Sequence, residues 1–123
     1  MIRGIVTLDR GPLVPLILRG PHGDQMDVNA VIDTGFTASL TIPPQLVATL
    51  GLVLGAEGKL KLADGTIRRF EQFTANVFWN GAWRSVLAST LGDDILVGLR
   101  MLEGHTLTVE VQPGGIVEIA PLQ

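Results

Sequence analysis

The segment Val31-Ile32-Asp33-Thr34-Gly35 decides how this sequence is interpreted. It runs from apolar residues directly into a carboxylate, then a small hydroxyl residue, then a glycine. The apolar residues predict a strand, and the end of a strand is a rigid place to hold a catalytic group. Glycine permits the sharp turn that exposes such a group. The alternative is an ordinary surface turn after a strand, so the flanking sequence has to decide.

The segments on either side of this turn are short, and frequent turn residues separate them, which is typical of an all-β domain. The length of 123 residues suits one domain, spanning 1–123, with a single core. Pro15 lacks an N–H group, so its strand should lie at a sheet edge or contain a bulge. Strands are predicted at residues 2–9, 13–19, 27–32, 106–111 and 116–119.

Two dipeptides predict tight hairpins, because both central residues of a type I′ turn need a positive φ. With Asn80-Gly81 as one turn, Phe78 should face Trp83 across the two strands. An aromatic pair of this kind contributes roughly 0.5–1 kcal/mol. A third turn is expected at Pro113-Gly114-Gly115.

The second of these dipeptides, Asp64-Gly65, predicts a hairpin in the middle of the chain. In a two-residue turn at this point, Ala63 would face Thr66 and Leu62 would face Ile67. Such a hairpin would have apolar residues on one face near its tip.

Helix is expected in only two places. Residues 44–50 begin with a proline and end before Gly51, which are start and stop signals for a helix. Residues 99–103 can form one or two helical turns before Gly104.

The composition excludes several classes of function. The chain has no Cys, which rules out disulfides, thiolate nucleophiles and Cys-based zinc sites. A net charge of −3 and a sequence pI near 5.2 argue against nucleic acid as a partner. Hydrophobic residues make up 46% of the chain, but no run approaches the roughly 20 apolar residues of a spanning helix. We therefore expect a cytoplasmic protein with no membrane partner.

In its order of motifs, the chain resembles the retropepsin-like, single-domain aspartic proteases of the pepsin clan. The motifs are Asp33-Thr34-Gly35, the short helix, the turn Ala63-Asp64-Gly65-Thr66 and the downstream segment Ile95-Leu96-Val97-Gly98. The resemblance covers about residues 4–120. It implies a closed or partly open β-barrel with one or two short helices. In that family the downstream segment crosses the Asp-Thr-Gly loop, and a hairpin forms a flap over the cleft.

The resemblance implies an aspartic endopeptidase that is active as a symmetric homodimer. Hydrolysis of a peptide needs a base to activate water and an acid to protonate the substrate. Two carboxylates that share one proton can perform both roles. The chain has one Asp-Thr-Gly sequence and is short for two lobes. Asp33 of each of two copies would therefore meet on a two-fold axis.

The resemblance also implies roles for other residues. Thr34 would bond across to the partner subunit, and Gly35 would form the turn. Phe36 would line the cleft or fill the core, and Thr37 could bond the catalytic carboxylate. The strand at 116–119 would contribute to the dimer sheet. Peptide or protein substrate would be bound by the flap tip and the wall of the cleft, at Phe36, Ala63, Asp64, Gly65, Thr66 and Val97.

Other chemistry has weaker support in the sequence. Asp93-Asp94 is interpreted as a loop, because adjacent residues of a strand point to opposite faces. His22 and His105 lack further converging ligands, so no metal and no cofactor are expected. No nucleophile-elbow pattern supports a Ser-His-Asp triad. Asp33-Thr34-Gly35 also resembles the segment around the phosphorylated aspartate of haloacid-dehalogenase-like phosphatases, but those enzymes need a larger α/β fold, and the sequence lacks its helices. The remaining alternative is a non-catalytic module of the same fold that binds peptides or forms dimers.

Overall fold

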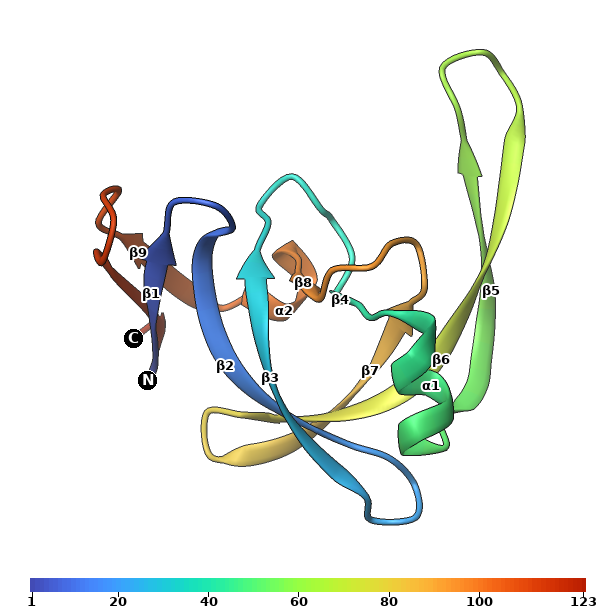
Figure 1. The fold of residues 1–123 in the computed structure, drawn as a ribbon, viewed down its shortest axis with the longest axis horizontal. Helices are drawn as coiled ribbons and strands as arrows, with labels where there is room; N and C mark the ends of the chain where they lie inside the picture. Colours follow the sequence, from blue (N-terminus) through green and yellow to red (C-terminus); the bar gives the residue numbers. More distant parts are fainter.

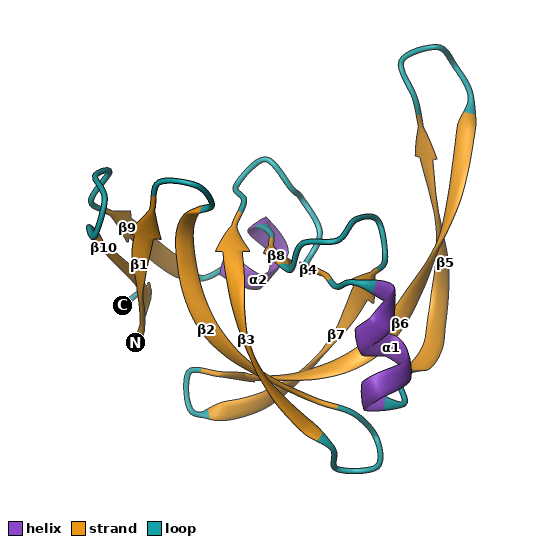
Figure 2. Ribbon diagram, viewed as in Figure 1, coloured by secondary structure: helices purple, strands orange, loops and turns teal.

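Ten strands form one mixed sheet in the computed structural model, which describes residues 1–123 (Figure 1). The two helices, α1 (Pro44–Leu50) and α2 (Leu99–Leu102), are short, so the protein is mainly β as the sequence predicts (Figure 2). The order across the sheet is β5-β6-β7-β4-β8-β3-β2-β1-β10-β9. The strands are β1 (Ile2–Thr7), β2 (Gly11–Arg19), β3 (Gln25–Ile32), β4 (Leu40–Thr41), β5 (Val53–Lys61), β6 (Ile67–Trp79), β7 (Ala82–Ser89), β8 (Leu96–Val97), β9 (His105–Val109) and β10 (Ile116–Pro121).

Six of the strands form a partial ring, because β6 pairs with β2 as well as with β5 and β7. The ring runs through β6, β7, β4, β8, β3 and β2, and two of these strands are only two residues long. Inward-facing side chains from the ring build the core, and those with no exposed surface include Leu18, Leu40, Val77 and Val97. The alternation of buried and exposed residues along β2 and β6 is the period of a half-buried strand.

Pro15 lies where β2 changes its neighbour. On one side of β2, β1 pairs with residues 11–13 and β6 pairs with residues 17–19. Pro15 falls between these two pairings, so one side of the strand is unpaired at the residue that has no N–H group. The expectation of an edge at this position is therefore confirmed locally.

The Asn80-Gly81 hairpin has the predicted register. Both turn residues have positive φ, 49° and 85°, as a type I′ turn requires. Phe78 faces Trp83, and the two rings meet edge to face with centroids 5.2 Å apart. The guanidinium of Arg19 stacks 3.9 Å from the centre of the Trp83 ring, which adds a cation–π contact to the pair.

The register predicted for the Asp64-Gly65 hairpin was wrong. Leu62 faces Thr66 rather than Ile67, and its N–H donates to the Thr66 carbonyl over 2.8 Å. Gly65 has a φ of 88°, whereas Asp64 is not in the left-handed region. The Gly65 N–H donates to the Leu62 carbonyl over 2.9 Å. A loop of three residues with glycine last replaces the expected two-residue turn, and this shifts each strand pair by one residue.

Helix α1 begins and ends at the predicted residues. Pro44 stands at its start, where a missing N–H breaks no helical bond. Gly51 ends it in the left-handed region, with φ of 63°. Neither helix is long and apolar enough to cross a membrane.

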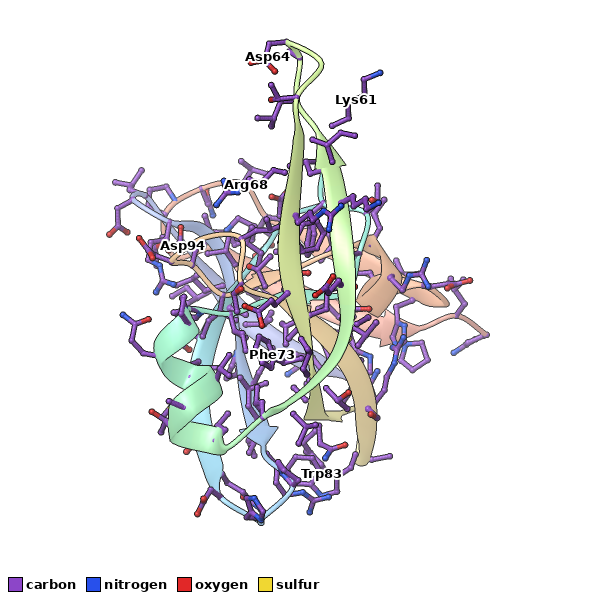
Figure 3. The ribbon with its side chains drawn as sticks, turned by 90° about the vertical axis from the view of Figure 1, so that its right-hand side faces the viewer. Lys61, Asp64, Arg68, Phe73, Trp83 and Asp94 are labelled. Carbon is purple, nitrogen blue, oxygen red and sulfur yellow. The ribbon has the colours of Figure 1, made fainter.

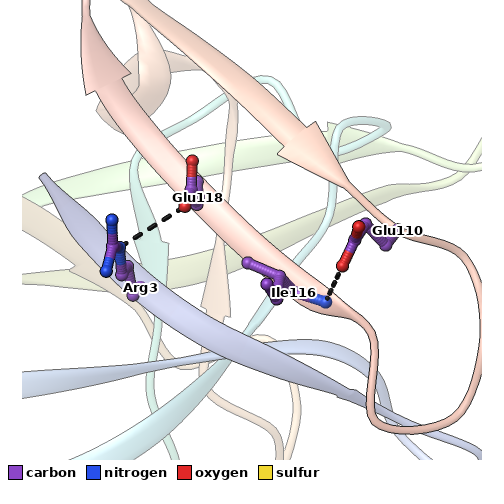
Figure 4. A network of polar contacts seen from close by, with 4 residues as sticks. All are labelled: Arg3, Glu110, Ile116 and Glu118. Atoms are coloured by element: carbon purple, nitrogen blue, oxygen red, sulfur yellow. Dashed lines mark hydrogen bonds and ion pairs between the residues drawn. The ribbon is translucent and has the colours of Figure 1, made fainter.

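Strands β1, β10 and β9 form the end of the sheet that carries both chain termini (Figure 1). Arg3 of β1 makes an ion pair of 3.4 Å with Glu118 of β10, and Glu110 accepts the Ile116 N–H over 3.0 Å (Figure 4). Strand β10 is paired on both sides within the chain. Within one chain β9 is therefore the edge strand at this end of the sheet, and the contribution of residues 116–119 to a dimer sheet stays a prediction.

Candidate functional site

Asp33 lies directly after the last residue of β3, where a second strand holds the backbone in place. Strand β8 runs parallel to the end of β3, and its Val97 carbonyl accepts the Asp33 N–H over 2.9 Å. The Ile95 carbonyl accepts the Val31 N–H over 2.8 Å on the same ladder. The downstream segment thus supports the Asp-Thr-Gly loop from behind, as predicted. Val97, expected to be part of the cleft wall, has no exposed surface and is not among the residues that line the pocket beside Asp33.

The loop after Asp33 is a tight turn that the carboxylate itself closes. The Gly35 N–H donates to Oδ1 of Asp33 over 2.9 Å, and the Phe36 N–H donates to the Asp33 carbonyl over 3.1 Å. Asp33 is half-buried, whereas Thr34 and Gly35 are exposed. No protein group bonds Oδ2 of Asp33, so one carboxylate oxygen is free for proton transfer.

Gly98 packs closely against the backbone of this loop. A Cβ at Gly98 would overlap the carbonyl oxygen of Ala38, and it would lie 2.6 Å from the ring of Phe36. The Gly98 N–H donates to the Ser39 carbonyl over 2.9 Å, and the Leu99 N–H donates to the Phe36 carbonyl over 2.8 Å. Two backbone segments can approach this closely only because residue 98 has no side chain.

A pocket of about 360 Å³ opens beside Asp33. Thr41 stands in its wall and is only 4% exposed. The Thr41 hydroxyl donates to the Asp94 carbonyl over 2.8 Å and accepts the Leu96 N–H over 3.0 Å, so it ties the pocket loop to β8. The residues that line the pocket are Asp33, Gly35, Phe36, Thr41, Leu91, Gly92, Asp93, Asp94 and Leu96.

Asp93 and Asp94 are the residues that sequence reasoning missed. They lie in the loop between β7 and β8, as predicted, but they also line the pocket of Asp33. Their place directly before the segment that crosses Asp33 was the available signal. No three His, Asp or Glu side chains are arranged to hold a metal ion.

The predicted flap tip lies outside this pocket. Ala63, Asp64, Gly65 and Thr66 are all exposed, and the β5–β6 hairpin projects from the rest of the molecule (Figure 1). Asp64 accepts the Thr66 hydroxyl over 2.7 Å and the Thr66 N–H over 2.9 Å. These two bonds lower the pKa of Asp64, because they stabilise the ionised carboxylate. The side chains at the tip are visible in Figure 3.

Phe36 and Thr37, which follow the Asp33 turn, differ in how far they are exposed. Phe36 is half-buried and lines the pocket, so it contributes both to packing and to the pocket wall. Thr37 is exposed and makes no hydrogen bond to Asp33. The one protein group that donates to the Asp33 carboxylate is the Gly35 N–H, which bonds Oδ1.

No protein-family model matches this chain, and no curated protein is significantly similar to it in sequence. A half-buried carboxylate with one free oxygen, held at a rigid strand end beside a pocket, can hold a water molecule and exchange a proton with it. It is also placed where a second carboxylate could approach from solvent, because the turn residues beyond it are exposed.

Proposed function

We propose that this protein is an aspartic endopeptidase of the retropepsin type, active as a symmetric homodimer. The observation that carries the proposal is the position of Asp33, at a strand end that a parallel strand braces through the Val97 carbonyl at 2.9 Å. In this proposal the partial ring of strands is the family's β-barrel, and the β5–β6 hairpin is its flap. No cofactor takes part in the reaction.

The proposed reaction uses two Asp33 carboxylates and one water. The ionised carboxylate removes a proton from the water as its oxygen bonds to the peptide carbonyl carbon. The protonated carboxyl of the other copy donates its proton to the carbonyl oxygen, which gives a neutral tetrahedral intermediate. One hydroxyl of the intermediate then gives its proton to the ionised carboxylate as the carbonyl re-forms, the amide nitrogen takes the proton of the other carboxyl, and the C–N bond breaks. The products are a carboxylic acid and an amine, and the pair again holds one proton.

Exposed apolar side chains support a second copy at the end of the molecule where Asp33 lies. The turn after β1, the loop after β3 and the turn before β10 all point upward in Figure 1, below the projecting tip of the β5–β6 hairpin. Leu8 is 86% exposed and Val111 is 88% exposed in two of these turns. Ile5 and Ile116 face each other on β1 and β10 and are half-exposed. Side chains of this kind are stabilised when a partner covers them.

The substrate would lie as an extended chain between the Asp33 loop and the hairpin. Phe36 would form an apolar wall for a substrate side chain, and residues 63–66 would bend toward the pocket when substrate enters. Thr34 would bond across the dimer axis, since it is exposed on the outer side of the loop. Hydrophobic side chains next to the scissile bond suit such a cleft.

The test compares Asp33→Asn with a matched variant of the same pocket, Asp94→Asn. Purified proteins are incubated with a mixed peptide library at several pH values from about 3 to 8, and products are identified by mass spectrometry. We expect Asp33→Asn to lower the rate by roughly 10³-fold or more, since it cannot act as a general base. Asp94→Asn should keep most of the activity. Cleavage by Asp33→Asn at the wild-type rate would refute the mechanism.

Mixed dimers test the requirement for two carboxylates. Wild-type protein diluted with an excess of Asp33→Asn should lose activity as heterodimers form, and sedimentation should show the same dimer for both proteins. An unchanged rate per wild-type chain would show that one Asp33 is sufficient. Tight peptide binding without cleavage in the wild type would instead identify the non-catalytic module.

A further inference from the structure

Charge is segregated between the hairpin and the rest of the molecule. Residues 58–69, the outer half of the β5–β6 hairpin, hold four of the nine Lys and Arg residues but one of the twelve Asp and Glu residues. This segment therefore has a net charge of +3, whereas the remainder of the chain has −6. A positive arm on an acidic protein attracts anionic partners and repels cationic ones.

The cations on the two faces of the hairpin differ in their surroundings. On one face Lys59 lies opposite Arg69, and the next pair on that face is Glu57 opposite Glu71. The two positive charges of the first pair therefore lie next to the two negative charges of the second.

Arg68 lies on the other face, where the adjacent strand positions are apolar, and no ion pair joins it to Glu57 or Glu71. Its cross-strand partner is Leu60, and the next residue on the same face of β6 is Phe70. The one ion pair of the structure joins Arg3 to Glu118, and the side chain of Arg68 makes no hydrogen bond. A guanidinium has five N–H donors, so Arg68 is free to bind a carboxylate with two parallel bonds.

Arg68 lines a cavity of about 430 Å³ that adjoins the pocket of Asp33. Leu91 lines both hollows, so the two are neighbours. Figure 3 shows Arg68 on the same side of the hairpin as Asp94, which lines the Asp33 pocket. The lining residues of this cavity are Glu57, Arg68, Arg69, Phe70, Glu71, Thr90 and Leu91.

One edge of β6 is free along this cavity. Strand β6 pairs with β7 from Gln72 onward, whereas residues 67–71 pair only with β5. Unpaired N–H and C=O groups of a strand edge can bond an extended polypeptide. The free edge, the apolar neighbours and the unpaired guanidinium together favour a polypeptide over a small anion.

We propose that Arg68 selects polypeptide substrates with a carboxylate in the segment that crosses this cavity. The inference rests on the proposed function for the substrate's place in the cleft, and it adds a specificity-determining residue. A peptide supplies a carboxylate from an acidic side chain or from its C-terminus. The proposal commits to the carboxylate group, and the test separates these two sources.

The test uses sets of peptides that differ at one position. Each peptide that the wild type cleaves is synthesised with Glu, Gln or Lys at successive positions flanking the cut, with both ends blocked, and once with a free C-terminus. We expect kcat/KM to be about threefold to tenfold higher for Glu than for Gln at one position, with Lys lowest, and the preference to shrink in high salt. A preference that appears only with a free C-terminus assigns Arg68 to the terminal carboxylate.

The charge-reversal variant Arg68→Glu should invert the preference, so that Lys peptides are cleaved faster than Glu peptides. Lys61→Glu is the matched control, because Lys61 is on the same hairpin and exposed but does not line the cavity. It should keep the wild-type order. Cleavage with no charge preference, or the same change in both variants, would overturn the inference while leaving the protease function intact.

Binding to the inactive Asp33→Asn protein separates the two proposals. Fluorescence anisotropy with labelled, blocked peptides that differ only in Glu, Gln or Lys at one position, chosen without regard to cleavage, should show tightest binding of the Glu peptide, and Arg68→Glu should reverse the order. If no peptide is cleaved by wild type but this binding preference holds, the proposed function fails and the role of Arg68 stands. Binding to phosphatidylserine vesicles that depends on Arg68, with no preference among peptides, would overturn the inference in favour of a lipid surface.

Discussion

Thr41→Val tests the argument that one buried hydroxyl holds the Asp33 pocket together. The change keeps the shape of the side chain and removes both of its hydrogen bonds, to the Asp94 carbonyl and from the Leu96 N–H. The loss of a hydrogen bond costs about 0.5–1.5 kcal/mol when no buried polar group is left unpaired. A buried donor that is left unpaired costs about 1–3 kcal/mol. Thr41 is 4% exposed, so water does not take the place of its hydroxyl in the variant. We therefore expect a loss of about 3 kcal/mol in the free energy of unfolding.

Urea denaturation followed by tryptophan fluorescence measures this loss. With a denaturant slope of about 2 kcal/mol/M, the midpoint should fall by roughly 1.5 M with no change in slope. Thr49→Val is the matched control, because Thr49 donates to the Gln45 carbonyl on the exposed side of α1. That variant should change stability by less than about 0.5 kcal/mol. Equal midpoints for Thr41→Val and wild type would refute the role given to this hydroxyl.

Two further predictions concern the Asp33 loop and the hairpin tip. Gly98→Ala places a Cβ against the Ala38 carbonyl, so unfolding measurements should show a loss of about 2–3 kcal/mol, whereas Gly92→Ala, with no atom within 4 Å of its Cβ, should be close to neutral. Equal effects at the two glycines would contradict the close approach. The carboxyl of Asp64 should titrate below its ordinary pKa of 3.8 in an NMR experiment, because it accepts two bonds from Thr66. The ionised form therefore stabilises the turn above that ordinary value, the stabilisation is lost as pH falls through the lowered pKa, and Thr66→Val should move the titration back upward.

Local signals in the sequence were sufficient for much of the fold. The bounds of α1 follow from Pro44 and Gly51, whose conformations are set by their own chemistry. The register of the β6–β7 hairpin follows from Asn80-Gly81, because both residues tolerate positive φ. The position of Asp33 at a strand end beside the segment ending at Val97 was also predicted correctly.

Features that depend on distant pairing were not predictable in the same way. An Asp-Gly pair fits a two-residue turn or the end of a three-residue loop, and the flanking strands decide between them. The angle at which a hairpin projects depends on the twist of β6, so the sequence did not place residues 63–66 outside the Asp33 pocket. The carboxylates Asp93 and Asp94 line that pocket because of how a loop folds back, which no periodicity encodes.

The pairing of β1 with β10 has a consequence for how the chain acquires its structure. Ile2 pairs with Ile119, so the first strand finds one of its partners only after nearly the whole segment has been synthesised. Val117 and Ile119, which have no exposed surface, complete the apolar interior from that late strand. Contacts so distant along the chain make folding slow, because the entropy of a long loop is lost before the contacts form. The nascent polypeptide should therefore depend on protection from aggregation until its final strands have emerged.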